Sequence, residues 1–165
     1  MHNVSPIQTC PLPAGALLGE YARTGAYTDC YAADVPATVS HAQYVAAFYT
    51  TPLFKLERLI LKWAISRPST GDQARQLAAG SLDRFAAWTV EKRAENQILL
   101  CAGRTRSWLM VAPLANGDGT RLYFGSAVVP KAGGSEMGPS YSALLGFHKL
   151  YSRALLYSAK ARLHP

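Results

Sequence analysis

The sequence predicts an α+β fold in which a curved antiparallel sheet packs on one long C-terminal helix, with a helix pair after the first strand. Residues 83–130 are dense in Trp, Tyr, Phe, Val and Thr and are interrupted by short turn signals, which is typical of an antiparallel meander. Residues 141–163 have the pattern of a single long helix. An antiparallel sheet must bury its apolar face, and such a helix can cover it.

The first part of the chain predicts an arm, a strand and two helices. Residues 1–25 are rich in Pro, Gly and Ala and lack a clear period, so we expect an irregular N-terminal arm before a single domain over 26–165. Alternation of side chains over 26–34 predicts a strand. Ser40 is a suitable cap for a helix beginning at residue 41, and Pro52 is expected near the first turn of a second helix.

The second part predicts a short helix and the meander. Residues 69–80 predict a third helix or a turn that ends at Gly80. Turn signals at 95–96, 102–103 and 115–119 divide the aromatic-rich region into four strands, which gives about five strands in the whole sheet. Gly125, inside the last of these strands, predicts a bend or a bulge.

Composition restricts the class of protein. The 165 residues are 49% hydrophobic and 16% charged with a net charge of +7, which is typical of a globular domain. Residues 1–80 carry six Lys/Arg against five Asp/Glu, and residues 81–165 carry eleven against five. The basic residues are scattered, so we interpret them as solvated faces and expect no nucleic-acid partner. A weak contact with an anionic membrane surface is the alternative that this asymmetry leaves open.

Several kinds of chemistry lack their sequence signals. The chain contains no GxSxG, P-loop or GxGxxG motif, and its four histidines lack metal-ligand spacing. We therefore expect no cofactor and no metal. Cys10, Cys30 and Cys101 are far apart and form no CxxC pair, which argues against a disulfide framework and favours a reducing, cytoplasmic location. The sequence shows no secretory signal and no apolar run long enough to span a membrane.

The C-terminal helix could contain a catalytic cluster, but its geometry separates the candidate residues. Successive residues lie about 100° apart on a helix. This spacing places Tyr151 on the face toward the sheet, His148 at the margin of that face, and Arg153 on the opposite face. The apolar face predicted in this way consists of Leu144, Phe147, Leu150, Tyr151, Ala154, Leu155 and Ser158, and the opposite face consists of Lys149, Arg153 and Lys160. The interpretation of ordinary helix packing is favoured over catalysis.

Glu57 is an unexpected charged residue on a predicted apolar helix face. It falls among the apolar residues of the predicted second helix, where a carboxylate costs several kcal/mol unless it is paired or protonated. We expect a structural salt bridge to Arg104 or Arg106. A ligand-facing or catalytic acid is the alternative.

Two strands supply candidate walls for a cavity. One strand presents Arg106, Trp108 and Met110 on one face, and the next presents Phe124 among alternating apolar residues. Both faces of both strands are largely apolar, so alternation does not decide which face is directed inward. Trp88 and Trp108 are expected to be wall or core residues.

The phrases "TRSWLMVAPL", "GTRLYFGSAVVP" and "LLGFHKLYSRALL", together with the order of elements, resemble the START-like (SRPBCC, helix-grip) superfamily and look like an uncharacterised bacterial branch of it. The resemblance covers roughly residues 26–163. It implies a deep cavity between the sheet and the C-terminal helix. In relatives this cavity holds lipids, quinones, polyketides or plant hormones, and in some of them it carries out cyclisation or hydrolysis.

These observations together predict non-covalent binding of a small apolar molecule that is lipid-, quinone- or polyketide-like. The alternatives are a cyclase or hydrolase on the same scaffold, and a module that binds a membrane surface or a protein partner. The residues expected to contact the ligand are Glu57, Trp88, Arg106, Trp108, Met110, Phe124, His148 and Tyr151.

Overall fold

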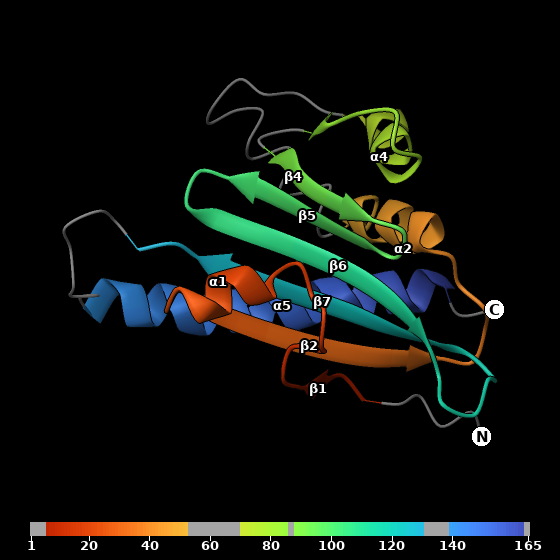
Figure 1. The fold of residues 1–165 in the computed structure, drawn as a ribbon, viewed down its shortest axis with the longest axis horizontal. Coiled ribbons are helices and arrows are strands. Elements are labelled where there is room, and N and C mark those ends of the chain that lie inside the picture. Colours follow the sequence, from red (N-terminus) through yellow and green to blue (C-terminus); the bar gives the residue numbers. More distant parts are fainter. Residues whose placement is uncertain (1–5, 53–69, 86–87, 131–138, 164–165) are drawn as a thin grey trace.

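A single antiparallel sheet is the centre of the molecule (Figure 1). The computed structural model describes residues 6–52, 70–85, 88–130 and 139–163, with side chains left undescribed at 139–148 and 150. The sheet has seven strands in the order β1-β2-β7-β6-β5-β4-β3, and each neighbouring pair is antiparallel wherever its register is defined. The predicted α+β class, with a helix-grip arrangement of sheet and long C-terminal helix, is confirmed.

The strands are β1 (Gln8–Thr9), β2 (Tyr27–Val35), β3 (Arg84–Phe85), β4 (Trp88–Ala94), β5 (Gln97–Ala102), β6 (Thr105–Pro113) and β7 (Thr120–Val128). The helices are α1 (Gly19–Arg23), α2 (His41–Tyr49), α4 (Gly71–Ala78) and α5 (Pro139–Leu163).

The expectation of about five strands is wrong, since the sheet has seven. The two strands that the sequence did not predict are β1 and β3, which have only two residues each. Segments this short carry no periodicity that a sequence pattern could reveal. The expectation of an irregular arm over residues 1–25 is also wrong, since residues 8–9 pair with β2 and residues 19–23 form α1. The turns that separate β4, β5, β6 and β7 lie where the sequence predicted them.

The two helices that the structure describes between β2 and β3, α2 and α4, begin at capping boxes. The Ser40 hydroxyl accepts a hydrogen bond from the Gln43 backbone N–H, and the Gln43 side chain accepts one from the Ser40 N–H. Thr70 and Gln73 make the same reciprocal pair at the start of α4. The predicted second helix of the pair, over 53–67, lies outside the described residues.

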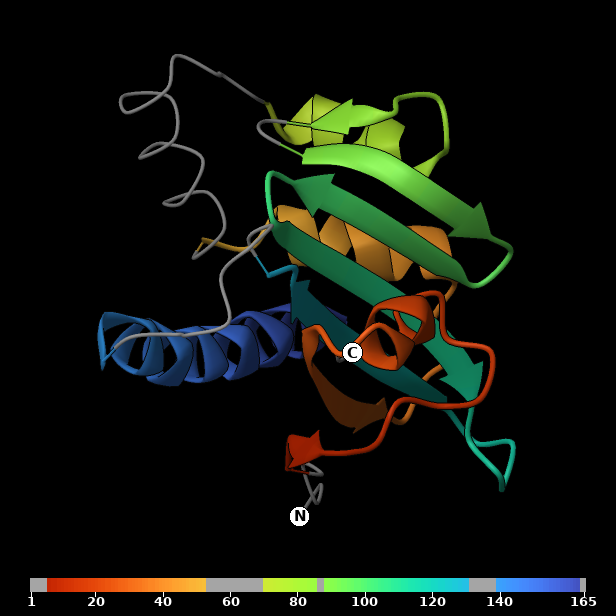
Figure 2. The same cartoon turned by 60° about the vertical axis from the view of Figure 1, so that its left-hand side comes forward.

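The sheet is covered on both faces (Figure 2). Helices α2, α4 and α5 lie on one face, which we call the inner face, and α1 with the segment before it lies on the outer face. The inner core includes Phe48, Leu109, Leu122, Phe124 and Leu156. The outer core includes Leu18, Cys30, Leu99, Trp108 and Met110. Both faces of β6 and β7 are apolar because both are buried.

The buried face of the described part of α5 overlaps the predicted face only in part. Ser152, Leu155, Leu156, Ala159 and Lys160 are buried, whereas Arg153 and Ala154 are exposed. The predictions for Leu155 and Arg153 are confirmed, and the predictions for Ala154 and Lys160 are wrong. Burial of Lys160 lowers the pKa of its amine, and the nearby Asp34 carboxylate partly opposes this effect.

Gln97 holds the outer segment against the sheet. Its side-chain oxygen accepts hydrogen bonds from the Leu17 backbone N–H and the Trp108 indole N–H, both at 2.9 Å. Its amide nitrogen donates to the Gly15 carbonyl at 3.1 Å. Two of these three bonds fix the path of residues 15–17, and the third joins the same buried side chain to Trp108 on β6.

Gly125 serves close packing, and the predicted alternative of a bulge is wrong at this position. The register of β7 with both neighbours continues through Gly125, and the irregularity in the sheet lies between Val90 and Lys92. A Cβ at residue 125 would lie 2.8 Å from Leu18 Cδ2 and 2.9 Å from Trp108 Cε3. Glycine is thus required because Leu18 packs directly on the strand.

Within the described residues, no helix combines the length and the apolar character needed to cross a membrane.

We expect Gly125→Ala to lower the free energy of unfolding by about 1–3 kcal/mol, since the new methyl group overlaps Leu18, Trp108 and a backbone oxygen. Urea denaturation followed by circular dichroism would measure the change. Gly19→Ala is the matched control, because a Cβ at residue 19 meets nothing within 4 Å. Equal effects of the two substitutions would contradict the packing role of Gly125.

Candidate functional site

A pocket of about 200 Å³ lies between the inner face of the sheet and α5. Its aromatic wall comes from four elements and consists of Phe48, Trp88, Phe124 and Tyr151. Phe48 and Phe124 are stacked, with ring centroids 5.0 Å apart. The remaining lining residues are Ala102, Thr105, Arg106, Ser107, Ser126, Ser152 and Leu155.

A cross-strand pair of serines lies in the wall that the sheet gives to this pocket. Ser107 on β6 is directly opposite Ser126 on β7. Both side chains are buried, with exposures of 5% and 1%. The next pair on the same face, Leu109 and Phe124, consists of large apolar side chains. Because serine side chains are small, the pair leaves space that side chains as large as Leu and Phe would fill.

The two sheet serines already have hydrogen-bond partners. Ser126 donates from its hydroxyl and from its backbone N–H to the same oxygen of Asp29, at 2.6 and 3.0 Å. The Ser107 hydroxyl lies 3.2 Å from the Tyr49 hydroxyl. These bonds fix the orientation of both groups and satisfy part of their hydrogen-bonding capacity.

Ser152 supplies the polar group on the helix side of the pocket. Its side chain is 1% exposed, and its Oγ has no hydrogen-bond partner among the described residues. A buried hydroxyl without a partner costs about 1–3 kcal/mol. A ligand that offers a hydrogen-bonding oxygen or nitrogen would remove this cost.

The structure brings together four of the residues predicted from sequence. Trp88, Arg106, Phe124 and Tyr151 all line the pocket between the sheet and α5. Trp108 and Met110 do not, because the pleat directs them to the outer face, where they pack with Leu18 and Leu99. Their predicted place between sheet and helix is therefore wrong.

Arg106 lines the pocket, but its guanidinium group belongs to the outer face. Nε lies 2.8 Å from the Tyr21 hydroxyl and 2.7 Å from a Glu91 oxygen, and the guanidinium lies 4.9 Å from the centre of the Tyr21 ring. The irregularity between Val90 and Lys92 places Glu91 outside the regular pairing of β4 with β5. Arg106 thus has Glu91 as its acidic partner, and Glu57 lies outside the described residues. The side chain of His148 is likewise not described.

Sequence reasoning missed the serines and Asp29. A Ser in the middle of an apolar strand is a weak signal, because Ser is also common on solvated faces. Only the pairing register, which places Ser107 opposite Ser126, makes the combination significant. Within the described residues, no three His, Cys, Asp or Glu side chains are grouped so that they could hold a metal ion.

Comparisons with known proteins add little to this description. No protein-family model matches the chain, and no curated protein matches it. Among solved structures, the chain is similar to a conserved protein of unknown function, EF2215, from Enterococcus faecalis. The two share 12% identity over 83% of this chain and 72% of that chain, with a TM-score of 0.40.

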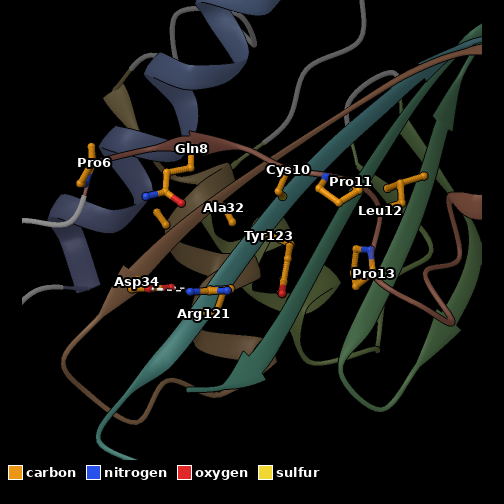
Figure 3. Close-up of a pocket in the computed structure, with 11 residues that line it drawn as sticks. Pro6, Gln8, Cys10, Pro11, Leu12, Pro13, Ala32, Asp34, Arg121 and Tyr123 are labelled. Atoms are coloured by element: carbon orange, nitrogen blue, oxygen red, sulfur yellow. Dashed lines mark hydrogen bonds and ion pairs between the residues drawn. The ribbon is translucent and has the colours of Figure 1, made fainter. Parts of the chain in front are cut away.

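A second hollow, of about 390 Å³, lies between the N-terminal segment and the outer surface of β2 and β7 (Figure 3). Arg121 and Asp34 form a two-pronged ion pair there, with N–O distances of 2.7 and 2.9 Å. The hydrogen bonds from Arg121 lower the pKa of the Asp34 carboxyl below its usual 3.8. Tyr123 and Cys10 line the same groove.

This ion pair should make stability depend on pH in a defined window. The folded-state pKa of Asp34 is lower than the unfolded value, so its contribution is complete above that value and is lost as pH falls through the folded-state pKa. We expect Arg121→Gln to cost up to about 1 kcal/mol above about pH 5, because the pair is partly exposed, and less below the usual carboxyl pKa.

The measurement is urea denaturation of both proteins from pH 2.5 to 7, as a rough range that brackets the carboxyl titration. The control repeats the Arg121→Gln comparison in an Asp34→Asn background, in which the effect should no longer vary with pH. A cost for Arg121→Gln that stays constant down to the lowest pH would count against the proposed linkage.

Proposed function

We propose that this protein binds a compact apolar ligand non-covalently in the pocket between the sheet and α5. The observation that carries the proposal is the buried Ser152 hydroxyl, which has no hydrogen-bond partner among the described residues and lies on a pocket with four aromatic side chains in its wall. Small-molecule sites are typically apolar cavities with a few fixed polar groups, and this pocket has that character.

The size of the pocket favours one part of the predicted ligand class. A cavity of roughly 150 Å³ accepts benzene, and drug-sized ligands occupy roughly 300–1,000 Å³. The pocket volume of about 200 Å³ suits a single ring with small substituents. Among lipid-, quinone- and polyketide-like molecules, a quinone-like ring is therefore the best match.

The polarity of the pocket supports the same choice. The ring walls of Phe48, Phe124 and Tyr151 offer stacking and edge contacts to an aromatic or quinonoid ring. Ser152 can donate to a carbonyl or hydroxyl oxygen on that ring. The described lining contains neutral hydroxyls, and the Arg106 guanidinium is bonded on the outer face, so an uncharged ligand fits best.

We further propose that the chain is a member of the START-like superfamily and is cytoplasmic. The order β2, α2, α4, the meander from β3 to β7 and then α5 supports the first proposal. All three cysteines are free thiols, as expected in a reducing compartment, which supports the second.

The first experiment is mass spectrometry of a solvent extract from gently purified protein, compared with the native mass of the complex. We expect one ring compound at close to one per chain. Titration of the ligand-free protein with phenol and with palmitate, followed by two-dimensional NMR, provides the second readout. Phenol should shift amide signals of β6, β7 and α5, and palmitate should not.

Two variants test the site itself. Ser152→Leu should fill the pocket and abolish phenol binding, whereas Ser158→Leu, on the same helix but outside the lining, should leave binding unchanged. Ser152→Ala keeps the space and removes the hydroxyl, so phenol should bind roughly three- to tenfold more weakly while benzene binds equally well. An empty extract combined with no phenol shift in folded wild-type protein would refute the proposal.

A further inference from the structure

Two cysteines that are far apart in sequence are neighbours in the fold. Cys10 follows β1, and its backbone N–H donates to the Cys30 carbonyl on β2 at 3.0 Å. The β1–β2 register therefore continues one pair beyond Thr9 and Tyr31, which places both cysteine side chains on the outer face. Their sulfur atoms are 3.4 Å apart.

We propose that Cys10 and Cys30 are an oxidisable dithiol site, which a low-molecular-weight disulfide of the glutathione type converts into an internal disulfide. Residues directly opposite on antiparallel strands have Cα atoms about 4.5–5.5 Å apart, which is within the range of disulfides. The sulfur atoms need to approach by roughly 1.4 Å to reach bonding distance.

The surface around the pair admits a small reagent from one side. Cys10 is half-buried and lines both the groove of Figure 3 and a neighbouring hollow of about 470 Å³. Cys30 is only 3% exposed but also lines the hollow of about 470 Å³. Lys149 lies on the same hollow and offers a positive charge to an anionic thiol compound.

The exposures determine the order of the two steps. The Cys10 thiolate attacks one sulfur of the small disulfide, forms a mixed disulfide and releases one small thiol, which takes up the proton that Cys10 lost. The Cys30 sulfur then attacks Cys10 Sγ, loses its proton and releases the second small thiol. Two electrons pass from the protein to the reagent. Burial raises the pKa of the Cys30 thiol, which lowers its thiolate fraction and argues against Cys30 as the group that attacks first.

The new bond would join residues 20 apart in sequence. It would close the loop that contains α1 and the residues that Gln97 holds against the sheet. A cross-link of this span restricts the unfolded chain, so we expect the melting temperature to rise by roughly 5–10 °C on oxidation.

The test is incubation of the folded wild-type protein with glutathione disulfide, followed by intact-mass measurement and tryptic mapping without reduction. We expect a loss of two hydrogen atoms per chain and a linked pair of peptides covering residues 1–23 and 24–55. Dithiothreitol should reverse both changes. The same products and the same rise in melting temperature are expected for Cys101→Ser, which serves as the reference protein.

Single substitutions in the Cys101→Ser background test the order of steps. Cys30→Ser should stop at a glutathione adduct on Cys10, and Cys10→Ser should gain no adduct. A wild-type product that carries only a stable glutathione adduct, that links Cys101, or that joins two chains would overturn the proposal. A melting temperature that falls on formation of the Cys10–Cys30 bond would also overturn it. The wild-type and Cys101→Ser results decide the matter if the other variants fail to fold.

Discussion

Burial of the central strands on both faces is the constraint on which the rest of the structure depends. Strands β6 and β7 present apolar side chains to both sides, so each side needs its own cover. Helices provide the cover on the inner face. On the outer face the cover is a short helix and an extended segment, whose backbone groups need partners away from a regular element. The buried Gln97 side chain supplies partners at Gly15 and Leu17 and also satisfies the Trp108 indole.

The sequence predicts the elements of this fold well where they are long. The meander, α2, α4 and α5 follow from turn signals, caps and helical periodicity. It predicts the two faces poorly, and Trp108 is the clearest case. Doubly buried strands have no apolar–polar alternation, so nothing in the local pattern indicates that Trp108 faces α1 while Phe124 faces α5. The pairing register and the position of α1 supply that information.

The candidate site depends on contacts between segments that are distant in sequence. Trp88, Phe124 and Tyr151 were predictable because large aromatic side chains in a sheet-and-helix fold generally face an interior. The serines were not, since their importance comes from the cross-strand pairing of Ser107 with Ser126 and from the absence of a partner for Ser152 among the described residues. The closeness of Cys10 to Cys30 also results from strand pairing and leaves no trace in their spacing.

The pairing of Ser107 with Ser126 separates the stability of the sheet from the volume available to a ligand, two properties that are usually coupled in a protein interior. Side chains at the adjacent pairs, such as Leu109 with Phe124, contribute to the stability and the register of the strands. The serine pair leaves space in the pocket wall and bonds to Asp29 and Tyr49. Substitution of these two residues by larger or smaller ones would change the volume of the pocket, while the backbone hydrogen bonds between β6 and β7 stay the same. Proteins that share this fold would therefore differ in the size of the ligand they accept through substitutions at this one cross-strand pair, without a change of fold.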